Sequence, residues 1–111
     1  MDTFDASRPT EQQIERYLKR VVEKTGGYCL KFVSPGFAGV PDRIILLPGA
    51  QVLFAELKAP GKKPRPNQKA VHRILEKLGF TVFGCVDSYT AADAVARTCE
   101  KVARKGEGDR R

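Results

Sequence analysis

The chain of 111 residues carries 20 Lys and Arg against 13 Asp and Glu, a formal net charge of +7 at pH 7. One domain is expected from this length, and the sequence shows no apolar stretch of membrane-spanning length and no leader, which predicts a soluble, cytoplasmic protein with no membrane partner. Its three cysteines are widely spaced, which argues against a disulfide framework or a zinc site, while the positive charge favours a polyanionic partner.

The first predicted element is a helix that follows a flexible N-terminus of residues 1–8. Thr10 and Gln13 have the spacing of a capping box, and Gly26-Gly27 ends the helix. From Gly106 onward, the small and charged tail is expected to be disordered. Between these ends we expect strands at 28–33, 43–47 and 51–58, a helix at 66–78, a strand at 80–86 and a helix at 90–105.

This order, αβββαβα, predicts an α/β fold in which a mixed sheet is flanked by helices on both faces. One domain is expected to cover residues 9–105. Helical periodicity also predicts which residues the last two helices bury. These residues are Val71, Ile74, Leu75 and Leu78 in the first of them, and Ala94, Val95, Thr98 and Val102 in the second.

Two acidic residues are predicted to face each other across a hairpin. The strands at 43–47 and 51–58 are separated by Pro48-Gly49-Ala50, a turn signal. Across a three-residue loop, Asp42 lies directly opposite Glu56, with Cβ atoms about 4.5–5.5 Å apart. A two-residue loop would slip the pairing by one residue and place the two acids on opposite faces.

Two carboxylates that close repel each other unless a cation lies between them, and Mg²⁺ or Mn²⁺ commonly binds through one or two carboxylates plus a substrate phosphate. Lys58 lies on the same face of its strand as Glu56, because strand side chains alternate. Asp42, Glu56 and Lys58 together therefore predict a metal-dependent site that cleaves a phosphodiester. The alternative is an ion pair at an exposed strand edge.

A basic segment follows this site. Residues 57–73 contain six basic side chains and no acidic one. We expect those after Lys58 to hold DNA phosphates without reading sequence, although a solvated basic face with no ligand is the alternative. They are Lys62, Lys63, Arg65, Lys69 and Arg73.

Three motifs occur in a fixed order: Gly39-Val40-Pro41-Asp42, then Phe54-Ala55-Glu56-Leu57-Lys58, then Gly61 and Gln68 at a helix start. In this order they resemble the VRR-NUC group of the PD-(D/E)xK nuclease superfamily, and the similarity covers about residues 10–86. The resemblance implies a restriction-endonuclease-like αβββαβ core with an extra C-terminal helix. It also implies a deoxyribonuclease that depends on Mg²⁺ or Mn²⁺.

The resemblance further implies roles for single residues. Family members carry a glutamate on the first helix, and Glu11 is preferred to Glu15 because it lies nearer to the centre of the apolar stripe. An acid that only favours the helix dipole is the alternative for Glu11, and a plain first-turn polar residue is the alternative for Gln68. The other implied residues are Asp42, Glu56 and the Leu57 carbonyl as metal ligands, Lys58 as the catalytic lysine and Gln68 as the motif glutamine.

His72, the single histidine, is expected at the surface or against a phosphate rather than as a general base. Two rival functions stay open: a nucleic-acid-binding module without catalysis, and a sequence-specific restriction-type nuclease. Compact members of the family resemble junction-resolving enzymes. The small size therefore favours a homodimeric endonuclease that prefers branched or four-way-junction DNA.

Overall fold

The computed structural model describes the backbone of residues 8–109 and the side chains of residues 8–105. Residues 1–7 of the expected flexible N-terminus and residues 110–111 of the expected tail lie outside the described part. The predicted order αβββαβα is confirmed. The elements are α1 (Glu11–Glu23), β1 (Tyr28–Lys31), β2 (Arg43–Leu47), β3 (Gln51–Leu57), α2 (Pro66–Lys77), β4 (Thr81–Val86) and α3 (Tyr89–Asp109).

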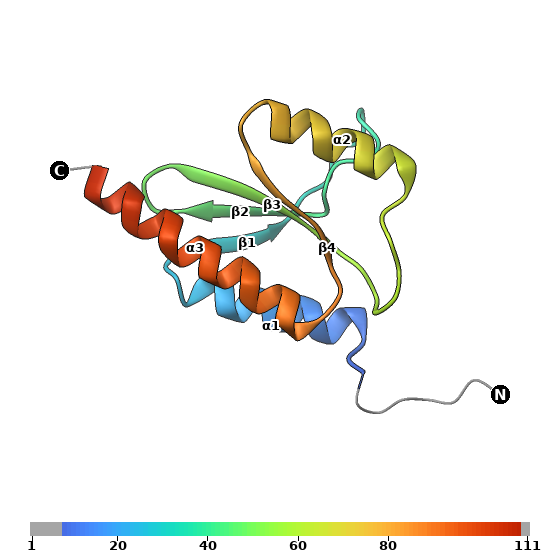
Figure 1. Cartoon of the computed structure of the whole chain (residues 1–111), viewed down its shortest axis with the longest axis horizontal. Helices are drawn as coiled ribbons and strands as arrows, with labels where there is room; N and C mark the ends of the chain where they lie inside the picture. Colours follow the sequence, from blue (N-terminus) through green and yellow to red (C-terminus); the bar gives the residue numbers. More distant parts are fainter. Residues whose placement is uncertain (1–7, 110–111) are drawn as a thin grey trace.

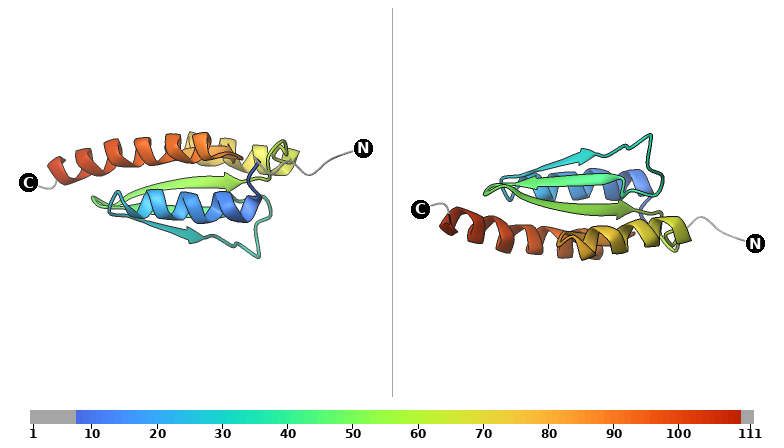
Figure 2. Two further views of the ribbon diagram at one scale, coloured as in Figure 1. Left: turned by 90° about the horizontal axis from the view of Figure 1, so that it is seen from below. Right: turned by 90° about the horizontal axis from the view of Figure 1, so that it is seen from above.

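The four strands form one mixed sheet in the order β1-β2-β3-β4. β1, β2 and β3 pair antiparallel, and β4 pairs parallel to β3. In Figure 1 the sheet is seen from its β4 side, with α2 above it and with α1 and α3 below it, and Figure 2 shows the same layers from two further directions. The predicted mixed sheet with helices on both faces is therefore confirmed. Within the described residues no helix combines the length and the apolarity that a membrane span needs.

The hairpin has the register that the three-residue loop predicts. Leu47 pairs with Gln51 and Arg43 pairs with Ala55, and Ala50 takes a positive φ of 61° in the turn. A side chain changes face at every residue along a strand. Continuing this register by one residue brings Asp42 opposite Glu56, so the alternative slipped register is excluded.

The pleat of β3 divides the interior into two layers. Leu53, Ala55 and Leu57 face α1 and α3, and all three are buried in one core with apolar residues of those helices. Phe54 points to the opposite face, where its ring lies 5.7 Å from that of Phe32 and 5.4 Å from that of Phe80. Glu56 has the same parity as Phe54, so the pleat directs it toward α2.

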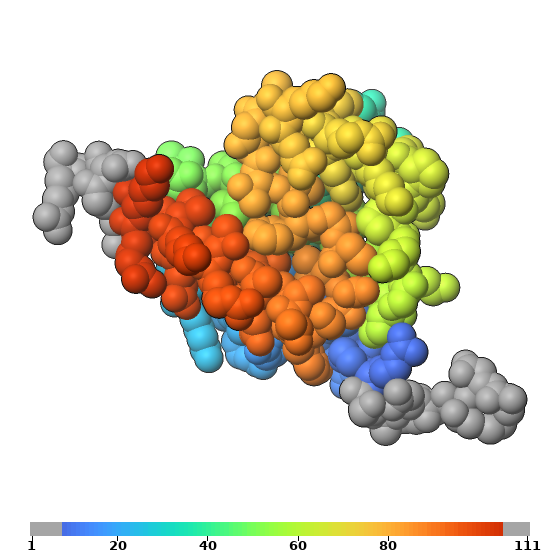
Figure 3. Space-filling model, viewed as in Figure 1, coloured from blue at the N-terminus to red at the C-terminus, as the bar shows by residue number. Residues whose placement is uncertain are grey.

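The buried face of α2 differs from the predicted one. Of the four residues expected to be buried, Val71 is buried and Leu75 is half-buried, whereas Ile74 and Leu78 are 46% and 69% exposed. Gln68 and His72 are buried instead. The reason is that, within residues 8–109, no helix other than α2 lies on its face of the sheet (Figure 1), so its apolar flank has no second helix to pack against. Figure 3 has the same view as Figure 1, from the β4 edge of the sheet, and there α2, β4 and α3 form most of the visible surface.

The last helix also differs from its prediction. Of the four residues expected to be buried, Val95 is fully buried, whereas Ala94, Thr98 and Val102 are half-buried. The buried stripe passes instead through Ala92, Val95, Cys99 and Ala103, because α3 packs against α1 as well as the sheet. The helix continues to Asp109, so residues 106–109 are helical where a disordered tail was expected.

Candidate active site

Asp42 and Glu56 lie together where β2 begins and β3 ends. Asp42 Oδ1 accepts a hydrogen bond from the backbone N–H of Leu57 at 3.0 Å, which fixes one acid to the strand that carries the other. The pairing of β3 with β4 shifts register between Ala55 and Leu57, where β4 carries one residue more than β3, so Glu56 lies opposite this irregularity. Glu56 is only 3% exposed.

Gln68 joins the acid to the lysine. Its Nε2 donates to Glu56 Oε2 at 3.2 Å, and its Oε1 accepts from Lys58 Nζ at 3.0 Å. The same Oε1 accepts from the backbone N–H of Arg65 at 2.8 Å, which caps the start of α2. Lys58 Nζ is also 3.8 Å from Glu56 Oε2. The amide therefore holds the ammonium beside the carboxylate.

His72 also belongs to this cluster. From the sequence it was expected at the surface or against a phosphate. The side chain is buried, with Nε2 3.5 Å from Glu56 Oε1. Gly84 of β4 leaves space for the ring, because a Cβ there would lie 3.1 Å from His72 Nδ1. The signal was available in the sequence, since His72 follows Gln68 by four residues and so shares its helix face.

Burial shifts the protonation of all three central groups. It raises the pKa of Asp42 to about 6; the N–H of Leu57 opposes this rise, and the charge of Glu56 adds to it. Burial also raises the pKa of Glu56, against the lowering effect of Lys58 and Arg65. It lowers the pKa of His72, so the imidazole is neutral at pH 7. Two crowded acids with raised pKa values are typical of a functional site.

The two candidate glutamates of α1 separate in the structure. Glu15 forms an ion pair with Arg43, on the face of the sheet that α1 covers. Glu11 is exposed at the start of α1, and its charge raises the pKa values of Asp42 and Glu56. Glu11 is therefore the α1 glutamate whose charge acts on Asp42 and Glu56. The choice of Glu11 as a ligand stays a prediction.

The basic segment borders the acid pair along the approach to α2 and its first turns. Arg65 contributes positive charge that lowers the pKa of Glu56. All five side chains of the segment beyond Lys58 are exposed. They are Lys62, Lys63, Arg65, Lys69 and Arg73.

The donor set fits a hard divalent cation that water and substrate help to coordinate. In the described part of the chain, no group of three or more His, Cys, Asp or Glu side chains gathers closely enough to hold an ion by itself. Two carboxylates that meet at one point are enough for Mg²⁺, which keeps several waters and takes substrate phosphate as a ligand. Glu56 Oε1 is buried without a hydrogen-bond partner, so it is an acceptor that such a cation could use.

The chain is similar to a curated protein and to solved structures. No family model matches the chain. It is 50% identical over 72 residues to a protein named "Putative nuclease p44" from Acyrthosiphon pisum secondary endosymbiont phage 1, a match that covers 65% of this chain and 77% of that protein. A solved structure described as a VRR_NUC domain is similar with a TM-score of 0.72 and 31% identity, over 80% of this chain and 97% of that one.

Proposed function

Because the chain belongs to the VRR-NUC family of nucleases, we propose that it is a divalent-metal-dependent DNA endonuclease selective for branched duplexes. One observation carries this proposal: half-buried Asp42 and Lys58 meet buried Glu56 in a cluster, and Gln68 hydrogen-bonds to both Glu56 and Lys58. A module that only binds DNA has no reason to bury two carboxylates where phosphate would dock, because their charge opposes binding.

In the proposed reaction, water hydrolyses a phosphodiester bond. Mg²⁺ or Mn²⁺ held by Asp42 and Glu56, with the Leu57 carbonyl and Glu11 as further ligands, would lower the pKa of the attacking water and polarise the phosphate. Lys58 places positive charge where negative charge grows on the phosphate in the transition state. Gln68 keeps the Lys58 ammonium in this position, because its Oε1 accepts a hydrogen bond from that group.

The basic segment Lys62, Lys63, Arg65, Lys69 and Arg73 would position the substrate. Exposed lysine and arginine side chains contact phosphates without distinguishing bases, so this set supplies affinity and orientation rather than sequence specificity. The protein would act inside the cell, where its DNA substrate lies.

The proposed selectivity for branched DNA rests on symmetry. One site of this kind cuts one strand at a time, and paired cuts across a junction require two sites in a fixed relation. A two-fold symmetric homodimer, the commonest closed assembly, supplies that relation. We therefore propose a homodimer that cuts four-way junctions in preference to linear duplex.

The test is a nicking assay on linear, flap and four-way-junction DNA with Mg²⁺, Mn²⁺ or EDTA. We expect cleavage with either metal, none in EDTA, and a fall of at least about 100-fold for Glu56→Gln or Lys58→Ala, which remove metal or charge stabilisation. Glu76→Gln is the matched control, because Glu76 is an exposed glutamate of α2.

Near-wild-type cleavage by Glu56→Gln, or a full rate in EDTA, would overturn the proposed mechanism. Tight binding of every DNA without any cut would support the non-catalytic module instead. Products with one fixed sequence at their ends would support the restriction-type enzyme.

A further inference from the structure

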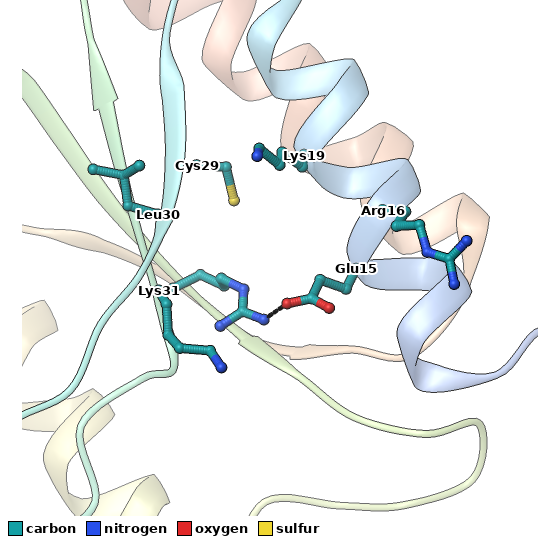
Figure 4. A pocket seen from close by; sticks show the side chains of 7 residues that line it. Glu15, Arg16, Lys19, Cys29, Leu30 and Lys31 are labelled. Carbon is teal, nitrogen blue, oxygen red and sulfur yellow. Dashed lines mark ion pairs between the residues drawn. The ribbon is translucent and has the colours of Figure 1, made fainter.

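A second basic site lies on the face of the sheet that α1 covers. A groove of about 390 Å³ runs between α1 and the edge strand β1. Figure 4 shows the sulfur of Cys29 and the carboxylate of Glu15 turned into the space between strand and helix, and Arg16 turned away from it. The lining residues are Glu15, Arg16, Lys19, Cys29, Leu30, Lys31 and Arg43.

The charges of this groove favour an anion. Lys19 on the helix and Lys31 on the strand are exposed, and neither forms an ion pair with any residue that the structure describes. The carboxylate of Glu15 is neutralised by Arg43. Burial raises the pKa of the Cys29 thiol to about 12, so the floor of the groove carries no thiolate that would repel an anion.

Arg43 connects the groove to the acid pair. Its Nη1 donates to the backbone carbonyl of Asp42 at 2.8 Å, while its other terminal nitrogen pairs with Glu15. Lys31 lies beside Arg43 in the register of β1 and β2. The groove therefore reaches the end of the strands where Asp42 and Glu56 lie, but on the face of the sheet opposite to Glu56, and Arg43 is its link to Asp42. The basic segment lies on the α2 side of this end, and the groove lies on the α1 side.

We propose that this groove binds backbone phosphates of the DNA strand on the side of the cut opposite to the basic segment. This inference rests on the proposed function. A DNA strand whose scissile phosphate lies at Asp42 and Glu56 continues away from these residues on both sides of the cut. Two strand spacings separate β1 from β3, about 10 Å. A DNA strand advances about 3.4 Å per nucleotide, and the groove also lies on the other face of the sheet, so it would meet a phosphate at least about three nucleotides from the cut.

The test is DNA binding in EDTA, where cleavage is absent. Lys19→Gln with Lys31→Gln removes the two exposed lysines of the groove. We expect the slope of log affinity against log salt to fall by about 1.8, and the affinity at 100 mM salt to fall by roughly ten-fold. Arg97→Gln with Lys101→Gln is the matched control, because it removes two exposed cations from the outer face of α3, and it should leave the slope within about 0.5 of wild type.

Equal slopes for the groove variant and wild type would overturn the inference, and so would equal losses in the groove and control variants. Lys31→Gln alone, with an expected fall of about 0.9, serves if the double variant folds poorly. Neutral methylphosphonates placed on one flank of the cut at a time identify the side: the groove variant should become insensitive to substitution at least about three nucleotides away on one flank only. A reduced slope in a protein that cuts no DNA would refute the nuclease proposal and leave the groove as a DNA contact.

Discussion

The amide of Gln68 both caps α2 and hydrogen-bonds to Lys58 and Glu56. As the third residue of α2 it caps the N–H of Arg65, and the same oxygen accepts from Lys58 while its nitrogen donates to Glu56. The two interpretations of this glutamine, as a first-turn polar residue and as a site residue, are thus compatible. Because the helix backbone fixes the capping position, the Gln68 amide has few alternative orientations beside Glu56.

Replacing Gln68 by alanine should cost stability and cleavage together. The change leaves buried Glu56 Oε2 without this donor and uncaps α2, so we expect the free energy of unfolding to fall by about 2–3 kcal/mol. Urea denaturation measures it, and Asn67→Ala, at an exposed position one residue earlier, is the control. A loss below about 0.5 kcal/mol would show that the amide contributes little.

The raised pKa of Asp42 predicts a pH-dependent stability in the absence of metal. Burial raises this pKa from 3.8 to about 6, so the folded protein holds the proton more tightly than the unfolded chain. Stability from this group is therefore full below about pH 4 and is lost as the pH rises through about 6. Asp42→Asn keeps an acceptor for the Leu57 N–H without the charge. In EDTA at pH 7 we expect it to be more stable than wild type by about 1–2 kcal/mol, less than the full shift implies because solvent screens the half-buried Asp42.

Denaturation of both proteins at pH 4 and pH 7 checks this, and the difference should vanish at pH 4. Adding Mn²⁺ at pH 7 should raise the Tm of wild type and leave that of Asp42→Asn nearly unchanged, because the variant lacks one of the two carboxylates. If Asp42→Asn were less stable than wild type at pH 7 in EDTA, the charge of Asp42 would not destabilise the folded protein, contrary to this prediction.

At the scale of elements, the loop before β2 is held against the start of α2. Gly39 takes a φ of +97°, and a Cβ there would lie 2.8 Å from the backbone oxygen of Asn67 and 3.0 Å from Val71 Cγ2. This contact fixes the distance between the segment that ends in Asp42 and the helix that carries Gln68. A glycine at this position is required by backbone conformation and by space.

Gly39→Ala should therefore destabilise the protein by more than about 1 kcal/mol, and a Tm scan should show a fall of about 4–8 °C for each kcal/mol. Gly36→Ala in the same loop is the control, since nothing lies within 4 Å of its added Cβ and its φ is not positive. Equal Tm values for the two variants would contradict the tight approach of loop and helix.

At the scale of the molecule, the proposed DNA path crosses the end of the sheet where β2 begins and β3 ends. The excess of 20 basic over 13 acidic residues gives long-range attraction for a polyanion, and the basic segment and the groove would direct it to the acid pair. The apolar surface left open is also relevant, because Tyr28, Val33 and Leu78 are each more than 60% exposed. Such side chains are available for contact with a second copy.

Assembly is the whole-molecule prediction. We expect the protein to sediment as a dimer of about twice 12.3 kDa at micromolar concentration, since a symmetric pair of sites is needed for paired cuts. Equilibrium sedimentation measures this. A monomer at all concentrations, together with equal cleavage of linear and four-way-junction DNA, would remove the junction-resolving proposal and leave the nuclease itself untouched.

The sequence by itself determined what depends on neighbours in the chain. Capping at Thr10 and Gln13, the turn at Pro48–Ala50 and the alternation of strand side chains are local or pairwise effects. They were enough to predict the order of elements and the hairpin register, and the register is what brings Asp42 opposite Glu56. The family resemblance followed from the same residues.

Only the tertiary structure decided which surfaces meet. Periodicity placed Ile74 and Leu78 inside, and His72 was expected at the surface or against a phosphate. The structure exposes the first two and buries His72, because no second helix of the described chain lies beside α2. It also separated Glu11 from Glu15, because only the packing of α1 on the sheet brings Arg43 to Glu15. The burial that raises the pKa of Asp42 arises in the same way. Burial and charge pairing depend on residues that are distant in the chain, so the local sequence pattern does not predict them.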